Sequence, residues 1–162
     1  MERVSKENYY LDIAQSVAMR STCLRRMYGA IIVKNDSIIS TGYNGAPRGR
    51  VNCSDLKYCL REKMQIPRGE RYELCRSIHS EANAIIAASR EQMIDADLYM
   101  TCVDPKTNEV VSNVCSCQMC KRMIINSGIK RVIVRENATE YTTYEVQDWI
   151  TEDDSLSGKS GY

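Results

Sequence analysis

Hydrophobic positions recur at helical spacing near the N-terminus and then change to the pattern of a β-hairpin. The apolar positions of the first segment are Leu11, Ile13, Ala14, Val17, Ala18 and Leu24. With Ser5 as the N-cap, they predict a helix over residues 5–25. Two apolar, β-rich runs then flank Asn35-Asp36-Ser37, which predicts a hairpin with strands near 29–34 and 37–43.

Residues 46–76 lack periodicity, and regular patterns return at His79. The elements predicted beyond that point are a helix over 80–92, a strand over 96–101, a helix over 118–128 that Gly128 terminates, a strand over 129–134 and a short helix over 143–150. The last dozen residues, 151–162, are polar and rich in Gly and Ser, so we expect them to be frayed.

Helices that alternate with strands predict a single α/β domain over residues 1–150, with a sheet covered by helices on both faces. The irregular segment 46–76, called the insert below, interrupts this domain. It holds three cysteines, eight basic and four acidic residues, and so has a net charge of +4. A long irregular segment inside a compact domain is usually functional or held in place by something.

The charges of the whole chain nearly cancel, with 22 basic and 21 acidic residues. Such a balance is not typical of proteins that bind long nucleic acids or anionic membranes, so we expect a small-molecule partner. No apolar run approaches the ~18 residues of a membrane span. The N-terminal stretch MERVSKENYYLDIAQ has charges where a signal peptide has its apolar core, so we expect a cytoplasmic protein.

Eight cysteines bear on the chemistry of the chain. They are Cys23, Cys53, Cys59, Cys75, Cys102, Cys115, Cys117 and Cys120. In a chain with no predicted export signal, we expect thiols or metal ligands and not a disulfide framework.

His79 is the only histidine, and it lies two residues before Glu81 at the start of a predicted helix. By itself it could be a partly buried ring that satisfies one hydrogen bond. Cys117 and Cys120 change this interpretation, because adjacent turns at the start of a helix bring such a pair onto one face, where free backbone N–H groups favour thiolates. One imidazole and two thiolates leave a tetrahedral zinc ion with one open position, which is the catalytic arrangement.

Glu81 then has a role as a carboxylate that does not bind the metal. Zinc lowers the pKa of a bound water to about 7, and a neighbouring carboxylate can take the proton and deliver it to a substrate. H-x-E followed by P-C-x-x-C is the signature of zinc-dependent nucleobase deaminases. Here Ser116 replaces the proline, and because serine is a favoured N-cap residue, the helix can still start in register.

Five stretches of the chain carry a more specific resemblance. Spread through most of residues 10–135, they read RSTCLRRMYGAIIV, STGYNGAPRG, CLREK, GERYELCRSIHSEANAII and CKRMIINSGIKRVIV. They resemble the deoxycytidylate (dCMP) deaminases of the cytidine deaminase-like superfamily, which includes the bacterial ComE operon protein 2. The resemblance implies a three-layer α/β/α sandwich with a five-stranded mixed sheet. It also implies hydrolytic deamination of dCMP to dUMP and ammonia, which supplies dUMP for thymidylate synthesis.

The same resemblance implies roles for individual residues. Zinc would be held by His79, Cys117 and Cys120. Glu81 would take the proton of the attacking water, pass it to ring N3 and then protonate the departing amine. Asn44 matches an asparagine that contacts the sugar in related deaminases, although Tyr-Asn-Gly-Ala-Pro is also an ordinary turn sequence.

A nucleotide also needs positive charge for its phosphate. The insert could supply it together with Arg20, Arg25 and Arg26, or these side chains could be ordinary solvated surface residues. Arg90 matches a position that the family associates with nucleotide binding near a subunit contact. The family is often activated by dCTP and inhibited by dTTP, in hexamers, so regulation by these nucleotides and a homo-oligomer are expectations from the resemblance alone.

Cys102 and Cys115 flank a loop, residues 103–116, that is longer than in most such deaminases and that bears on the entrance of the pocket. Cys102 is expected to be a small buried hydrophobe. Cys115 could compete with Cys117 for zinc, but it precedes the helix, so we expect it not to bind.

Cys23, Cys53, Cys59 and Cys75 form a candidate second metal site. Three of them lie in the insert, where ordering costs about 1–2 kcal/mol per residue with little apolar burial in return, so a cross-link is expected. Some dCMP deaminases carry an additional structural zinc in this region, and four thiolates would make such a site closed and structural. The alternative is four unrelated buried thiols.

Two rival functions share parts of the pattern. A tRNA adenosine deaminase or another cytosine-nucleoside deaminase uses the same zinc motif, but binding a polyanion needs a marked basic surface, and the net charge here is +1. A non-enzymatic zinc or iron–sulfur module would also explain the cysteines. A purely structural site, however, does not need Glu81 beside its ligands.

Overall fold

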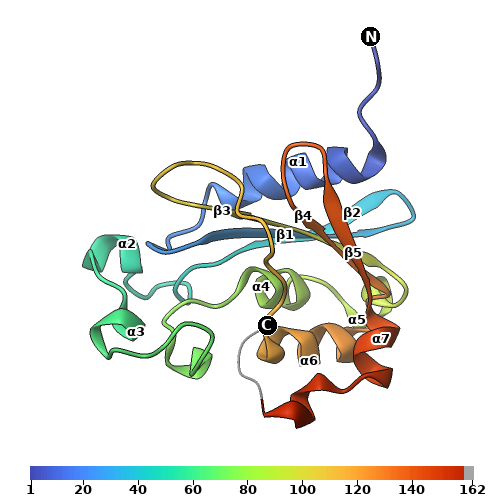
Figure 1. The fold of residues 1–162 in the computed structure, drawn as a ribbon. Coiled ribbons are helices and arrows are strands. Elements are labelled where there is room, and N and C mark those ends of the chain that lie inside the picture. The colour runs from blue at the N-terminus through green and yellow to red at the C-terminus, as the bar shows by residue number, and fades with distance from the viewer. Residues whose placement is uncertain (159–162) are drawn as a thin grey trace.

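A five-stranded mixed sheet forms the centre of the fold (Figure 1). The computed structural model describes residues 1–158. In chain order the elements are α1 (Lys6–Ala18), β1 (Met27–Lys34), β2 (Ser37–Tyr43), α2 (Cys53–Leu56), α3 (Leu60–Lys63), the 3-10 turn η1 (Tyr72–Leu74), α4 (Ser80–Ile86), α5 (Arg90–Met93), β3 (Asp97–Val103), α6 (Gln118–Ser127), β4 (Arg131–Arg135), β5 (Tyr141–Glu145), α7 (Val146–Thr151) and the 3-10 turn η2 (Asp154–Ser157). The predicted α/β class and mixed five-stranded sheet are confirmed.

The strands lie in the order β2-β1-β3-β4-β5. Strand β1 pairs antiparallel with β2 and β3, β3 pairs parallel with β4, and β4 pairs antiparallel with β5. Asn35 and Asp36 connect β1 to β2 with φ angles of 50° and 57°. Two positive φ angles are what a two-residue type I′ turn requires, so the predicted hairpin is confirmed, with β1 beginning two residues earlier than expected.

Helices cover both faces of the sheet, with α1 on one face and α4 and α6 on the other (Figure 1). Successive strand residues point to opposite faces, so each strand contributes to two apolar layers. The α1 layer contains Leu11, Ala14, Ile31, Val33, Tyr99 and Ile133. The opposite layer contains Ala30, Ile32, Ala84, Leu98, Met100, Ile124, Val132 and Val134. The result is the three-layer α/β/α sandwich that the resemblance implied.

Two strand glycines let the helices pack directly on the sheet backbone. A Cβ atom added at Gly29 would lie 2.0 Å from the carbonyl oxygen of Ala14 in α1. A Cβ atom at Gly42 would lie 2.3 Å from the carbonyl oxygen of Ser80, the first residue of α4. Because no side chain tolerates such distances, Gly42 sets how closely the start of α4 approaches β2.

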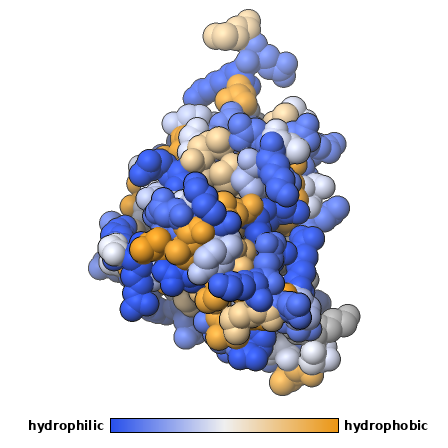
Figure 2. Space-filling view, turned by 90° about the vertical axis from the view of Figure 1, so that its left-hand side faces the viewer, coloured by the Kyte–Doolittle hydropathy of each residue, from blue (hydrophilic) through white to orange (hydrophobic). Residues whose placement is uncertain are grey.

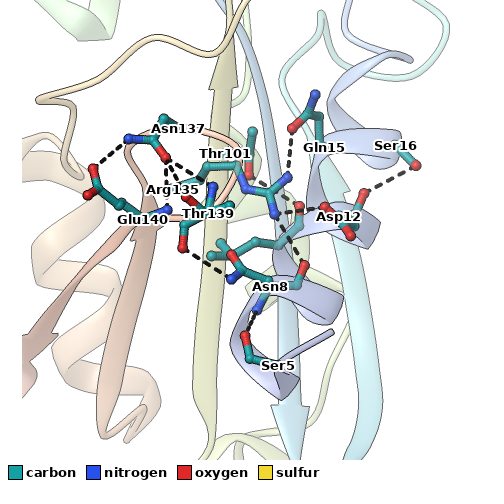
Figure 3. Close-up of polar contacts among 11 residues, drawn as sticks. Ser5, Asn8, Asp12, Gln15, Ser16, Thr101, Arg135, Asn137, Thr139 and Glu140 are labelled. Carbon is teal, nitrogen blue, oxygen red and sulfur yellow. Dashed lines mark hydrogen bonds and ion pairs between the residues drawn. The ribbon is translucent and has the colours of Figure 1, made fainter. Parts of the chain in front are cut away.

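Arg135, at the end of β4, binds the N-terminal helix α1 to the sheet through polar contacts (Figure 3). Its guanidinium lies 2.7 Å from Oδ1 of Asp12 and donates to Oε1 of Gln15 at 2.9 Å and to the carbonyl oxygen of Asn8 at 3.2 Å. The side-chain amide of Asn8 in turn donates to the carbonyl oxygen of Thr139 at 3.1 Å. Helix α1 is therefore held by polar contacts to the β4–β5 turn as well as by its apolar face.

The first helix is shorter than predicted, because it ends at Ala18 and not near residue 25. Leu24 lies in the loop that follows. The backbone N–H of Thr22 donates to the carbonyl oxygen of Asn44 at 3.2 Å, so the chain leaves the helix to bond with the end of β2.

The single helix predicted over 80–92 is two helices, α4 and α5, separated by residues 87–89. Ser89 caps α5, and its capping box with Gln92 is complete. This Ser-x-x-Gln signature marks a new helix start, and it lay hidden inside an otherwise continuous apolar pattern.

The C-terminal part differs from the prediction in two respects. Residues 141–145 form β5, whose alternating exposed and half-buried side chains give no apolar run, and α7 begins only at Val146. The tail expected to be frayed contains the end of α7 and the 3-10 turn η2, where Asp154 lies 3.3 Å from Nζ of Lys121. Residues 159–162 of that tail lie outside the described residues.

The insert consists of short helical turns arranged around one buried arginine. Arg61 is 5% exposed, and its guanidinium donates to the carbonyl oxygens of Pro67, at 3.0 Å, and Glu70. Its guanidinium also lies 4.5 Å from the ring centroid of Tyr72. Within residues 1–158, no helix combines the length and the apolar character needed to cross a membrane.

Candidate active site

His79 and Cys117 occupy equivalent positions, each as the N-cap of a helix on the same face of the sheet. Their backbone angles are nearly identical, with φ −70° and ψ 155° for His79 and φ −67° and ψ 166° for Cys117. Neither side chain makes the usual capping hydrogen bond to its own helix. Since α4 and α6 also contact each other, the two side chains are available to share a ligand.

The structure brings the three predicted metal ligands together. Nδ1 of His79 lies 3.5 Å from Sγ of Cys117 and 3.4 Å from Sγ of Cys120. All three ligand atoms lie within 4.8 Å of one another, and no other group of three His, Cys, Asp or Glu side chains in residues 1–158 does so. One imidazole nitrogen and two sulfurs at this spacing fit a tetrahedral zinc ion that keeps one position open.

The ionisation of the cluster also favours a cation. Hydrogen bonds from the Cys120 thiol and from His79 lower the pKa of Cys117 to about 4. The same contact with Cys117, together with burial, raises the pKa of Cys120. Burial opposes a charge on His79, but hydrogen bonds with Cys117 and Cys75 raise its pKa to about 10. One thiolate thus forms readily, and the second needs a positive ion beside it.

Glu81 lies beside this cluster without being one of its ligands. It is the second residue of α4, is 4% exposed, and accepts a hydrogen bond at Oε2 from the Ser80 hydroxyl at 3.0 Å. Its carboxyl group is close enough to Cys120 to contribute to the raised pKa of that thiol. A buried carboxylate next to a metal site is placed to move protons during a reaction.

A cavity of about 150 Å³ adjoins the cluster and is lined by His79, Glu81 and Cys117. Four arginines also line it: Arg25, Arg26, Arg61 and Arg68. The insert therefore contributes to the cavity. Figure 2 shows the side of the molecule that carries the insert, where hydrophilic residues cover most of the surface between smaller apolar areas. Arg20 is exposed and is not part of the lining, so the structure does not bring this phosphate candidate to the site.

Asn44 is buried in the wall of the cavity, and its side chain forms hydrogen bonds with neighbouring parts of the chain. Its Oδ1 accepts from the backbone N–H of Tyr28 at 2.8 Å and from the Ser21 hydroxyl, and its Nδ2 donates to the carbonyl oxygen of Arg26 at 2.9 Å. An amide has two N–H donors, so one remains for a ligand. The bonds to Tyr28 and Arg26 join the end of β2 to the start of β1, and the contact of Asn44 with a sugar stays a prediction.

The four cysteines proposed for a second metal are neighbours but do not form a preorganised site. Cys23 lies in the loop after α1, and the other three lie at the ends of α2, α3 and η1. Burial raises the pKa of Cys53, and the charges of Cys23, Cys75 and Cys59 add to this shift. No three of these sulfurs come within the 4.8 Å that the His79 cluster shows.

The remaining two cysteines and Ser116 lie outside the candidate metal cluster. Cys102 is fully buried on β3, as expected of a small hydrophobe, and Cys115 lines the cavity without joining the ligand group. Ser116 is also fully buried, but the N-cap of α6 is Cys117, so the prediction that Ser116 caps this helix is wrong by one residue. Cys117, a candidate metal ligand, itself occupies the capping position.

Arg90 lies away from the catalytic cavity. It opens α5, donates from Nε to the carbonyl oxygen of Asn126 at 3.1 Å, and lines a shallow groove with Arg122 and Met93. Its position is compatible with a second nucleotide site, and the role stays a prediction.

Sequence reasoning missed Tyr72 as a contact of the metal ligand. The Tyr72 and His79 rings meet edge to face, with centroids 5.2 Å apart. Since Arg61 lies on the same tyrosine ring, a chain of contacts joins the insert to the metal cluster. The stretch GERYELC, which resembles the deaminases, was the available signal.

Comparison with known proteins identifies relatives for most of the chain. Residues 4–136 match the family model described as "Cytidine and deoxycytidylate deaminase zinc-binding region". The deoxycytidylate deaminase of Mycobacterium phage D29 is 37% identical over 137 residues, which cover 82% of this chain and 96% of the relative. That of Schizosaccharomyces pombe is 33% identical over 132 residues, 81% of this chain but only 37% of the relative.

The fold has a solved counterpart as well. The crystal structure of dCMP deaminase from the cyanophage S-TIM5 in apo form matches with a TM-score of 0.54 and 27% identity, over 80% of this chain and 81% of that one. The matched family region includes all three members of the metal cluster and Glu81.

Proposed function

Because the chain belongs to the cytidine and deoxycytidylate deaminase family, we propose that it converts dCMP to dUMP and ammonia by hydrolysis. The observation that carries this proposal is the His79, Cys117 and Cys120 cluster, with the buried Glu81 beside it, in a cavity that arginines also line. The product would supply dUMP for thymidylate synthesis.

The residues of the cluster divide the chemistry between them. His79, Cys117 and Cys120 would hold zinc, which when bound supplies a Lewis acid that activates water at neutral pH. Glu81 would accept a proton from the water that attacks C4 and deliver it to ring N3. It would then take the second proton, from the new hydroxyl on C4, and pass it to the amine, so that ammonia leaves as the C4 carbonyl forms. The Ser80 hydroxyl, hydrogen-bonded to Glu81, orients the carboxylate for these transfers.

The cavity favours a mononucleotide over the rival substrates. Asn44 can offer its remaining N–H to the sugar, and the guanidinium groups can bind a phosphate. A tRNA adenosine deaminase would need a broad basic surface, whereas the net charge of this chain is +1. The relatives named deoxycytidylate deaminase support the same substrate.

We infer a cytoplasmic homo-oligomer, in which Arg90 contributes to a site for dCTP and dTTP, and a second zinc among Cys23, Cys53, Cys59 and Cys75. All eight cysteines are free thiols, as expected in a reducing compartment. Light scattering with and without dCTP tests the assembly, and dCTP activation that Arg90→Met abolishes tests the regulatory site.

A direct assay tests the function. Purified protein with one zinc per catalytic cluster should release ammonia from dCMP, more slowly from deoxycytidine, and not from the wobble adenosine of a tRNA. Ammonia release from tRNA alone would make the chain an adenosine deaminase. A zinc-loaded protein that acts on none of the three substrates would contradict the enzymatic proposal.

A further inference from the structure

Arg26 is anchored in the wall of the cavity, immediately before β1. Its carbonyl oxygen accepts a hydrogen bond from Nδ2 of the buried Asn44 at 2.9 Å, and the next residue but one, Tyr28, donates its N–H to Oδ1 of Asn44 at 2.8 Å. The side chain is 35% exposed, so it reaches the opening of the cavity from a fixed base.

The guanidinium of Arg26 is only partly used by the protein. Nη1 donates to the carbonyl oxygen of Arg25 at 2.8 Å and to Oδ2 of Asp104 at 3.4 Å. Nε is buried and has no hydrogen-bond partner among the residues that the structure describes. Nε and Nη2 form one edge of the planar fork that binds two oxygens of a carboxylate or phosphate, and this edge is not the one held by Asp104.

Asp104 is itself held firmly at the start of the long loop after β3. Its Oδ1 accepts from the backbone N–H of Lys106 at 2.8 Å, and its own backbone N–H donates to the carbonyl oxygen of Glu109 at 2.9 Å. The backbone N–H of Asn108 donates to its carbonyl oxygen at 2.8 Å. The carboxylate therefore presents Oδ2 to Arg26 from a rigid turn.

The other arginines of the cavity are engaged differently. Nε of Arg25 lies 3.0 Å from Oε1 of Glu62. Nη2 of Arg61 donates to two carbonyl oxygens of the insert, and its Nε, like that of Arg26, has no partner among the described residues. Arg68 also lines the cavity and adds positive charge to it. Among the four, Arg26 combines a fixed base, a carboxylate that orients it and an unused donor edge.

We propose that Arg26 binds the 5′-phosphate of the substrate, and that Asp104 is a positioning residue that orients this guanidinium. The inference rests on the proposed deamination of a deoxycytidine nucleotide. This inference assigns a role to the loop over 104–116, because its first residue, Asp104, contributes to the preference for a nucleotide over a nucleoside.

Two substrates and a matched control separate this role from a structural one. Arg26→Met should lower kcat/KM for dCMP by roughly 10- to 100-fold, the loss expected for charge-assisted hydrogen bonds. The value for deoxycytidine should change less than about threefold, because no phosphate is present. Arg20→Met removes an exposed arginine outside the cavity and should alter neither value. Arg26→Lys keeps the charge without the fork and should fall between.

Asp104→Asn tests the positioning role, because the amide oxygen can still accept from Lys106 while the charge is lost. We expect KM for dCMP to rise several-fold with kcat nearly unchanged and deoxycytidine unaffected. In the double variant with Arg26→Met, Asp104→Asn should add no further effect. A lower KM for dCMP in Asp104→Asn would mean that the carboxylate competes with the phosphate, and would overturn the positioning role.

The outcomes distinguish this inference from the proposed function. If unmodified protein deaminates dCMP well and Arg26→Met keeps the full preference for dCMP over deoxycytidine, only the phosphate assignment fails. Equal losses on both substrates would make Arg26 structural. If Arg26→Met is unfolded by circular dichroism, Arg26→Lys decides, since it should retain the fold and still lose selectivity. Absence of deamination of either substrate by zinc-loaded unmodified protein would reject the proposed function itself.

Discussion

The two groups of cysteines in this chain differ in what holds them. Cys117 and Cys120 belong to the start of α6, a ten-residue helix packed on the sheet, and they meet His79 within 4.8 Å. The insert cysteines Cys53 and Cys59 lie at the starts of two four-residue helices, Cys53 as the first residue of α2 and Cys59 as the N-cap of α3, and no three sulfurs of the second group lie as close together as the ligand atoms of the His79 cluster. Regular elements hold the ligand atoms of the first group in place before a metal binds. In the irregular segment, metal binding itself must bring the sulfurs together.

The largest effect is expected when the preorganised group loses one of its ligands. Cys120→Ala removes one of three ligands, so the catalytic zinc and dCMP turnover should both be lost. Cys59→Ala, the matched change in the insert, should keep the catalytic zinc and most of the activity. Zinc content by elemental analysis and ammonia release check both variants, and equal damage from the two changes would contradict the distinction.

The second prediction concerns a substitution that should displace a candidate metal ligand from a distance. Gly42→Ala would place a Cβ atom against the backbone of Ser80, so α4 must shift and carry His79 and Glu81 with it. We expect a loss of stability of about 1–3 kcal/mol and a fall in turnover of at least ~10²-fold. Thr41→Ala, on the exposed face of the same strand, should do neither. Chemical denaturation and the dCMP assay measure these effects.

A third change loosens the insert at its centre. Arg61→Met removes the bonds to Pro67 and Glu70 and the contact with Tyr72, so the tyrosine should no longer support His79. We expect about 1–3 kcal/mol less stability and roughly tenfold lower kcat/KM with the zinc retained. Lys63→Met, exposed on the same short helix, serves as the control. Unchanged protease cleavage within the insert of Arg61→Met would contradict this role.

The smallest expected effect concerns the second metal. Protein purified without chelator should hold close to two zinc per chain, and Cys53→Ser or Cys75→Ser should leave one, with a lower melting temperature and residual activity. One zinc in the unmodified protein, together with an unaltered melting temperature for Cys53→Ser, would show that packing around Arg61 holds the insert.

The sequence was most informative where local pattern and chemistry coincide. The candidate metal cluster could be predicted because the imidazole and the Cys-x-x-Cys pair both lie at helix starts, which short-range spacing reveals. Strand β5 was missed because its exposed, alternating side chains resemble a loop, and the break at Ser89 was hidden by a continuous apolar face.

Long-range packing decided the rest. Of the arginines considered, packing brings Arg25 and Arg26 to the cavity and leaves Arg20 outside, although all three are close in sequence. The contact between Arg26 and Asp104 joins residues 78 positions apart, and no local pattern indicates it. The same applies to Tyr72 and His79, whose contact depends on how the insert folds back.

Replacement of Glu81 by glutamine tests the proposed chemistry most directly. Glu81→Gln keeps the size and hydrogen bonding of the side chain but cannot shuttle protons. We expect zinc content and melting temperature to match the unmodified protein while kcat for dCMP falls by ~10³-fold or more. The exposed Glu91→Gln should behave like the parent. Near-normal turnover by Glu81→Gln with its zinc in place would remove Glu81 from the mechanism.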